Sequence, residues 1–132
     1  MTYLLYVLVK LACYTAWVWL GLRLWQQDAA TAWRALGLGM LRLGIGVFFG
    51  VVIFFAVRTE RYGLFWKYVE IYTPVRMAEW FLMAVIIRRN SAGKTPSATL
   101  LWCLGGIVVS FAADLASPEG LAGHFCVGRC LC

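Results

Sequence analysis

The chain has 132 residues, of which 63% are hydrophobic and 14% are charged, with a formal net charge of +6. Soluble domains use about 45–50% apolar residues, so this composition excludes an ordinary water-soluble domain and predicts a membrane protein. Its apolar runs also take up most of the length, which leaves no room for a separate soluble catalytic domain.

Four apolar runs follow one another along the chain. Each is close to the roughly 20 residues that an α-helix needs to cross about 30 Å of hydrocarbon. We therefore predict an all-α fold: a polytopic membrane protein with four transmembrane helices in a compact bundle with short loops. The bundle occupies residues 1–117 and a cysteine-rich tail occupies 118–132, with expected spans at 4–24, 35–57, 64–87 and 98–116.

The first run, 4–24, is expected to remain in the protein as a span. No basic residue precedes it and no small-residue cleavage site follows it, so it differs from a signal peptide. The polar segment WQQDAATAW comes next, and it offers Asp28 or Thr31 as the N-cap of the second helix.

Small residues mark the second run, 35–57, and the fourth. Helices in lipid pack closely where small side chains let their backbones approach. We expect the small faces of these two helices to contact other helices, within the chain or across an oligomer. The expected packing residues are Gly39, Gly46 and Gly50, with Gly37 and Gly44 beside them, and then Gly106 and Ser110.

The third run, 64–87, contains Pro74 near its middle, which should remove a backbone hydrogen bond and kink the helix. We expect the arginine that follows, Arg76, to reach the carbonyl groups that such a kink frees. Before the fourth run, Thr95 as cap and Pro96 as the first helical residue should begin the last helix.

Apart from Arg23 and Lys67, which lie near the ends of their runs, six charged residues fall inside the four runs, three basic and three acidic. Charges at these depths are costly unless they face inward and are paired. Counting residues from the centre of each span puts opposite charges at matching depths. Lys10 can meet Glu70 or Asp114, and Glu79 can meet Arg42 and Arg76. We expect an inward charge ladder that is either a structural lock or a transport or binding site, formed by Lys10, Arg42, Glu70, Arg76, Glu79 and Asp114.

The tail gathers four soft ligands within nine residues: His124, Cys126, Cys130 and Cys132. They could hold a thiophilic metal such as zinc, the only cofactor that the sequence suggests. Palmitoylation near a membrane surface, a disulfide and free thiols stay open as alternatives. His124 is the only histidine, so a pair of histidines within one chain is excluded, and no nucleophile is accompanied by a base.

Function is expected to follow from the bundle. The first hypothesis is a non-enzymatic helix-packing subunit or scaffold; the alternative is a minimal oligomeric transporter or channel that uses intramembrane carboxylates. A membrane metal or redox component is the third. The expected partners are the bilayer with its anionic headgroups, and further copies or other membrane subunits, but not nucleic acid. The dense basic segment RRNSAGK favours a cytoplasmic third loop, with both termini outside.

Overall fold

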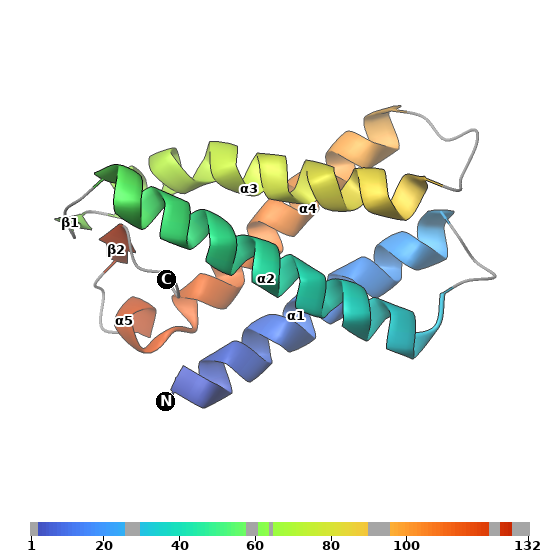
Figure 1. The fold of residues 1–132 in the computed structure, drawn as a ribbon, viewed down its shortest axis with the longest axis horizontal. Helices are drawn as coiled ribbons and strands as arrows, with labels where there is room; N and C mark the ends of the chain where they lie inside the picture. The colour runs from blue at the N-terminus through green and yellow to red at the C-terminus, as the bar shows by residue number, and fades with distance from the viewer. Residues whose placement is uncertain are drawn as a thin grey trace.

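A computed structural model describes residues 3–25, 30–57, 61–63, 65–89, 96–121 and 125–127. Four long helices alternate in direction along the chain (Figure 1). They are α1 (Tyr3–Trp25), α2 (Ala32–Val57), α3 (Phe65–Arg88) and α4 (Pro96–Leu115). The helices coincide with the four apolar runs to within three residues at each end. The chain is thus helical, as expected from its composition.

Three of these helices, α1, α2 and α4, are long and apolar enough to cross a membrane, counted over the described residues. The fourth, α3, has 24 residues and is therefore also long enough, but it is less hydrophobic because charges such as Arg76 and Glu79 lie within it. It continues as one helix through Pro74. Beside the proline, the hydroxyl of Thr73 donates a hydrogen bond of 2.6 Å to the carbonyl of Val69, a contact that often accompanies a bend.

Local signals in the sequence account for where the helices begin. The amide of Arg34 donates to Thr31 Oγ1 at 3.3 Å, which makes Thr31 the N-cap of α2. Helix α4 begins at Pro96. A backbone N–H at the first position of a helix has no intrahelical acceptor, so proline, which lacks this group, is well tolerated there. After α4, Ser117 Oγ accepts a bond from the amide of Gly120 at 2.9 Å and caps the short helix α5 (Pro118–Leu121).

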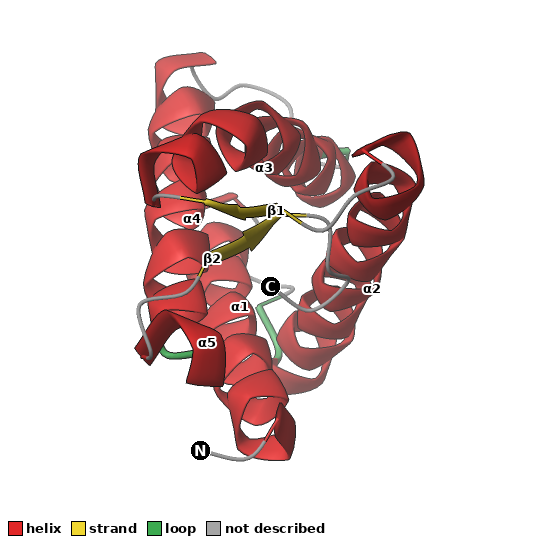
Figure 2. Cartoon of the chain, turned by 90° about the vertical axis from the view of Figure 1, so that its left-hand side faces the viewer, coloured by secondary structure: helices red, strands yellow, loops and turns green. Residues whose placement is uncertain are grey.

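The sequence did not predict a small sheet at one end of the bundle. Strand β1 (Arg61–Gly63) pairs antiparallel with β2 (Phe125–Val127), with Tyr62 opposite Cys126. Figure 2 shows the two strands at the end of the molecule where α2 ends and α3 begins. The pairing joins the second connection to the C-terminal segment, both of which were expected to be loop.

The helices pack unequally. Helix α1 has its most extensive contacts with α2 and α4, and α3 packs mainly on α4, whereas α2 and α3 meet over a smaller surface. An apolar core fills the half of the bundle nearest the end of α1, and it includes Val18, Leu22, Trp80, Met83 and Trp102. Among the buried charged residues, Lys10 and Asp114 lie toward the other end, where α1 begins and α4 ends, whereas Arg42, Arg76 and Glu79 lie near the middle of their helices.

Candidate functional site: a buried ionic network

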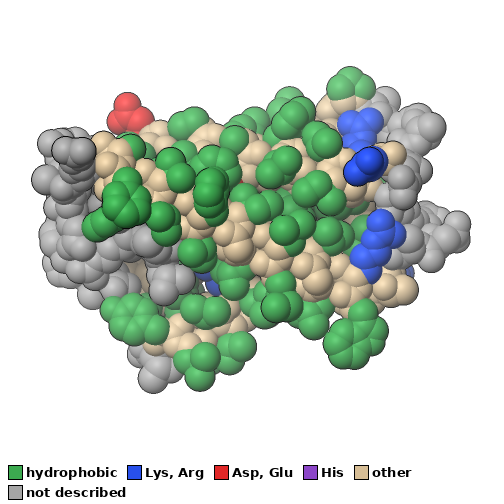
Figure 3. Space-filling model, viewed as in Figure 1, with side chains coloured by type: hydrophobic (Ala, Val, Ile, Leu, Met, Phe, Trp, Pro, Cys, Tyr) green, Lys and Arg blue, Asp and Glu red, His purple; other side chains and the backbone are tan. Residues whose placement is uncertain are grey.

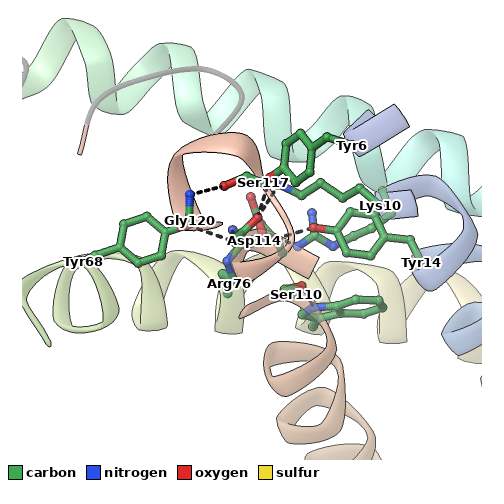
Figure 4. Close-up of polar contacts among 12 residues, drawn as sticks. Tyr6, Lys10, Tyr14, Tyr68, Arg76, Ser110, Asp114, Ser117 and Gly120 are labelled. Carbon is green, nitrogen blue, oxygen red and sulfur yellow. Dashed lines mark hydrogen bonds and ion pairs between the residues drawn. The ribbon is translucent and has the colours of Figure 1, made fainter. Parts of the chain in front are cut away.

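Asp114, near the end of α4, is the centre of a polar network inside the bundle (Figure 4). Its Oδ1 accepts a hydrogen bond from Tyr6 at 2.9 Å and one from Lys10 Nζ at 2.6 Å. Its Oδ2 accepts a bond from Tyr68 at 2.7 Å and pairs with the guanidinium of Arg76. One carboxylate that is 3% exposed therefore holds two cations and two phenols from two other helices.

Helical spacing on α1 explains how three members of this network reach the same place. Tyr6, Lys10 and Tyr14 are separated by four residues each, so they lie on one face of the helix, and all three are buried. Lys10 Nζ also donates to the hydroxyl of Tyr6 at 2.8 Å. The same face continues into the apolar core through Val18 and Leu22. Polar and apolar packing thus share one stripe of α1.

Arg76 of α3 connects Asp114 to the centre of the bundle. One of its terminal nitrogens pairs with Asp114, and the other donates to the hydroxyl of Tyr14 at 3.2 Å. Its guanidinium carbon also lies 5.4 Å from the centre of the Phe111 ring, within the range of a cation–π contact. The arginine is held by α1 and α4 as well as by its own helix.

A second ion pair lies between α2 and α3. Arg42 Nη2 is 2.5 Å from Glu79 Oε2, and Arg42 is completely buried. Its guanidinium carbon lies 4.8 Å from the Tyr14 ring centre and 4.9 Å from that of Trp80. The indole of Trp80 donates in turn to Ser110 Oγ at 3.0 Å. Aromatic rings from α1 and α3 therefore pack against this cation.

Five of the six residues expected in the charge ladder are buried, and two details differ from the expectation. Glu70 is exposed on α3, because the inward face of the helix carries Tyr72, Arg76 and Glu79 and Glu70 lies on the opposite side. Arg76 pairs with Asp114 of α4 rather than with Glu79 on its own helix. Counting residues along the spans puts Arg76 and Asp114 at different depths, and the long side chain of Arg76 spans this difference.

The small residues of α2 and α4 differ in whether another helix lies close to them. A Cβ added at Gly39 would lie 2.4 Å from Thr15 Oγ1 and 3.1 Å from Thr15 Cα, and one at Gly106 would lie 2.5 Å from the ring of Trp80. These two glycines are close helix contacts. By contrast, Gly37 and Gly44 face open space, with nothing within 4 Å. Gly50 is buried.

Several partners in the network were missed by the sequence reasoning. Tyr6 and Tyr68 both donate hydrogen bonds to Asp114. The spacing of four residues between Tyr6 and Lys10 could have indicated that Tyr6 shares the inward face of its helix. Two tryptophans also join α1 to α4: Trp17 Nε1 donates to the carbonyl of Trp102 at 3.1 Å, and Trp102 Nε1 donates to the carbonyl of Trp17 at 3.3 Å. Nothing in the sequence pairs them, because their positions depend on how the helices are rotated.

The expected metal, lipidation or disulfide site of the tail falls outside what the structure describes. His124, Cys130 and Cys132 lie beyond the described residues, and Cys126 lies in β2, of which only the backbone is described. Within the described ranges, no group of three or more His, Cys, Asp or Glu side chains is arranged to hold a metal ion. Cys13 and Cys103 are free thiols within α1 and α4.

Comparison with known proteins adds no identification. No protein family, curated protein or solved structure matches this chain. What the site can do must therefore be judged from its own chemistry. It offers two carboxylates, each already bound by a cation, and phenols that donate to one of them. This arrangement is suited to holding helices together or to binding a small charged species.

Proposed function

We propose that the protein is a small integral membrane protein whose four long helices all cross the bilayer, and that it is a non-enzymatic helix-packing subunit or scaffold of a membrane complex. Apolar side chains cover the middle of the face seen in Figure 3, whereas Lys and Arg side chains gather at the end where α1 and α3 end. The described basic residues at that end are Arg23, Arg34, Arg88 and Arg89. Such a belt with a charged end fits a lipid environment with anionic headgroups.

The inward pairing of two of its charges, Arg76 and Glu79, supports α3 as the fourth span. An unpaired charge at the centre of a bilayer costs about 2.5–3.5 kcal/mol on insertion scales. Arg76 and Glu79 avoid most of this cost. They are buried inside the bundle, at 5% and 3% exposure, and pair with Asp114 and Arg42 respectively. The outward face of α3 carries residues such as Ile71, Phe81 and Val85, which are compatible with lipid.

The observation that carries the scaffold proposal is that two carboxylates join all four helices. Asp114 of α4 binds α1 through Lys10 and α3 through Arg76, and Glu79 of α3 binds Arg42 of α2. Paired buried charges penalise any rotation or shift that separates them, so they fix the register of helices in lipid, where hydrophobicity alone does not. A rigid bundle of this kind is what a packing subunit requires.

Helix α2 offers the surface for a partner. Gly37, Leu41, Gly44 and Phe48 follow one another at spacings of four and three, so they lie on one face, and all four are exposed. Two glycines separated by a large apolar residue form a shallow notch that can receive a ridge from another membrane helix. We propose that this stripe packs against a further copy of the chain or against another membrane subunit.

Native mass spectrometry of the protein, extracted gently from its own membrane, tests the subunit proposal. We expect a complex of fixed stoichiometry that Gly44→Leu disrupts and that Ala112→Leu, which enlarges an exposed residue of α4, leaves intact. A monomer in the wild-type spectrum, or equal behaviour of the two variants, would contradict the proposal.

The transport alternative is favoured by one observation, namely that Glu79 lines a small cavity inside the bundle. Glu79→Gln distinguishes the two functions. If Glu79 serves only to hold Arg42, its neutralisation should weaken the assembly by leaving a buried arginine unpaired. If Glu79 is a transport group, flux through reconstituted vesicles should be lost while the assembly stays intact.

A further inference from the structure

A cavity of about 30 Å³ lies between α1, α2 and α3 beside the ionic network. Its wall includes Tyr6, Lys10, Tyr14, Gly46, Arg76 and Glu79. A single water molecule needs about 10–15 Å³ of such volume, so the cavity has room for a species of about that size, and a halide ion is similar in size to water. A multi-atom organic substrate does not fit.

Two buried arginines carry hydrogen-bond donors that are not used within the described network: Arg76, which is part of the cavity wall, and Arg42, which is not. Nε of Arg76, which lines the cavity, has no hydrogen-bond partner there, and neither do Nε and Nη1 of Arg42. Arg42 Nη1 lies 3.2 Å from the position of a Cβ on Gly46, another residue of the wall. A buried guanidinium N–H without an acceptor is unfavourable, so an acceptor in the cavity would be stabilised.

The buried charges do not balance. Among the described residues the interior contains three cations, Lys10, Arg42 and Arg76, but only two carboxylates, Glu79 and Asp114. The third acidic residue expected there, Glu70, is exposed. One positive charge is therefore in excess in a region of low dielectric, where uncompensated charge is strongly disfavoured. Water could accept hydrogen bonds from the arginines, but it would not neutralise this charge.

We propose that the cavity binds one small monovalent anion, with chloride as the probe, held by Lys10 and Arg76 and aided by the guanidinium of Arg42. The site goes beyond the packing function, because a scaffold needs no ligand. The bound ion would bring the charge of the interior to zero and complete the network.

Thermal unfolding of the full chain in detergent tests the site. Sodium gluconate, whose anion is too large for the cavity, is replaced stepwise by sodium chloride at constant ionic strength. We expect the unfolding midpoint to rise by roughly 4–8 °C along a saturating curve, since a ligand that binds only the folded state stabilises it. Equal midpoints in the two salts would overturn the proposal.

Three variants test whether the rise of the unfolding midpoint with chloride arises from binding in the cavity. Lys10→Met removes the excess charge and should raise the half-saturating chloride concentration by roughly tenfold or more. Gly46→Ala places a methyl group beside Arg42 Nη1 and should also weaken the response. Ala112→Leu enlarges an exposed residue of α4 outside the cavity wall and should respond like the wild type. A chloride response that survives in both Lys10→Met and Gly46→Ala would overturn the proposal.

A second readout applies if Lys10→Met does not fold. Exchange of chloride with a protein site broadens its ³⁵Cl resonance, so the folded wild type and Ala112→Leu should both broaden the line beyond a detergent blank. Gly46→Ala should broaden it less. Absence of broadening by the wild type, or equal broadening by all three proteins, would show that the cavity does not bind chloride.

Discussion

Replacing Asp114 by asparagine should destabilise the bundle more than any other single change of similar size. The substitution keeps the shape of the side chain but removes the charge that Lys10 and Arg76 share. Removing one partner of a buried ion pair costs about 3–5 kcal/mol. Because two cations lose their partner here, and Tyr6 and Tyr68 lose a charged acceptor, we expect the upper end of this range, about 5 kcal/mol.

The assay is equilibrium unfolding in detergent, followed by tryptophan fluorescence, for which the chain provides seven tryptophans. The matched control is Glu70→Gln, which makes the same chemical change at an exposed carboxylate. Exposed substitutions usually change the free energy of unfolding by no more than about 0.5 kcal/mol. A loss below about 1 kcal/mol in Asp114→Asn, similar to the control, would refute the idea that this carboxylate compensates two buried cations.

A second substitution separates the loss of charge balance from a simple loss of contacts. Asp114→Asn combined with Arg76→Met removes one of the two cations that the first change leaves uncompensated. We expect the double variant to be more stable than the sum of the single effects predicts, by roughly 0.5–3 kcal/mol, as residues in one network couple by this amount. Additive effects would show that the two side chains do not compensate each other.

Three further outcomes are expected from the same unfolding assay. Gly39→Ala should lose about 1–3 kcal/mol, since the added methyl group meets Thr15 and its backbone. Gly44→Ala on the same helix, where the space is open, should be neutral or up to about 1 kcal/mol more stable; equal effects of the two would contradict the packing between α1 and α2. Ser110→Ala should cost about 1–3 kcal/mol by leaving the buried Trp80 N–H without an acceptor, and Ser110→Thr, which keeps the hydroxyl, should retain more of the stability.

The four helices could be predicted from the sequence because each follows a local rule. Apolar runs of about 20 residues define them, Thr31 caps the start of α2, and Pro96 begins α4. The pairs Lys10–Asp114 and Arg42–Glu79 were among those expected from depth alone, since opposite charges at the same level of a small bundle have few other partners. Sequence thus specifies local structure and approximate depth.

The rest depends on how the helices are rotated about their axes, which side-chain packing decides. Trp80 fits against Gly106 and so fixes the face that α3 presents to α4. With this rotation Arg76 points toward Asp114, and Glu70 points outward. The pairing of β1 with β2 joins segments far apart in the chain whose short sequences carry no clear alternation. Neither feature could be read from the periodicity of a single helix.

Cysteine labelling from each side of the membrane is the most direct measurement of whether α3 crosses the bilayer. In a background without the native cysteines, single cysteines replace Thr59, before α3, and Ser91, after it. We predict that an impermeant reagent outside the cell labels Thr59→Cys, and that Ser91→Cys is labelled only after the membrane is opened. Labelling of both positions from the same side would contradict a fourth span.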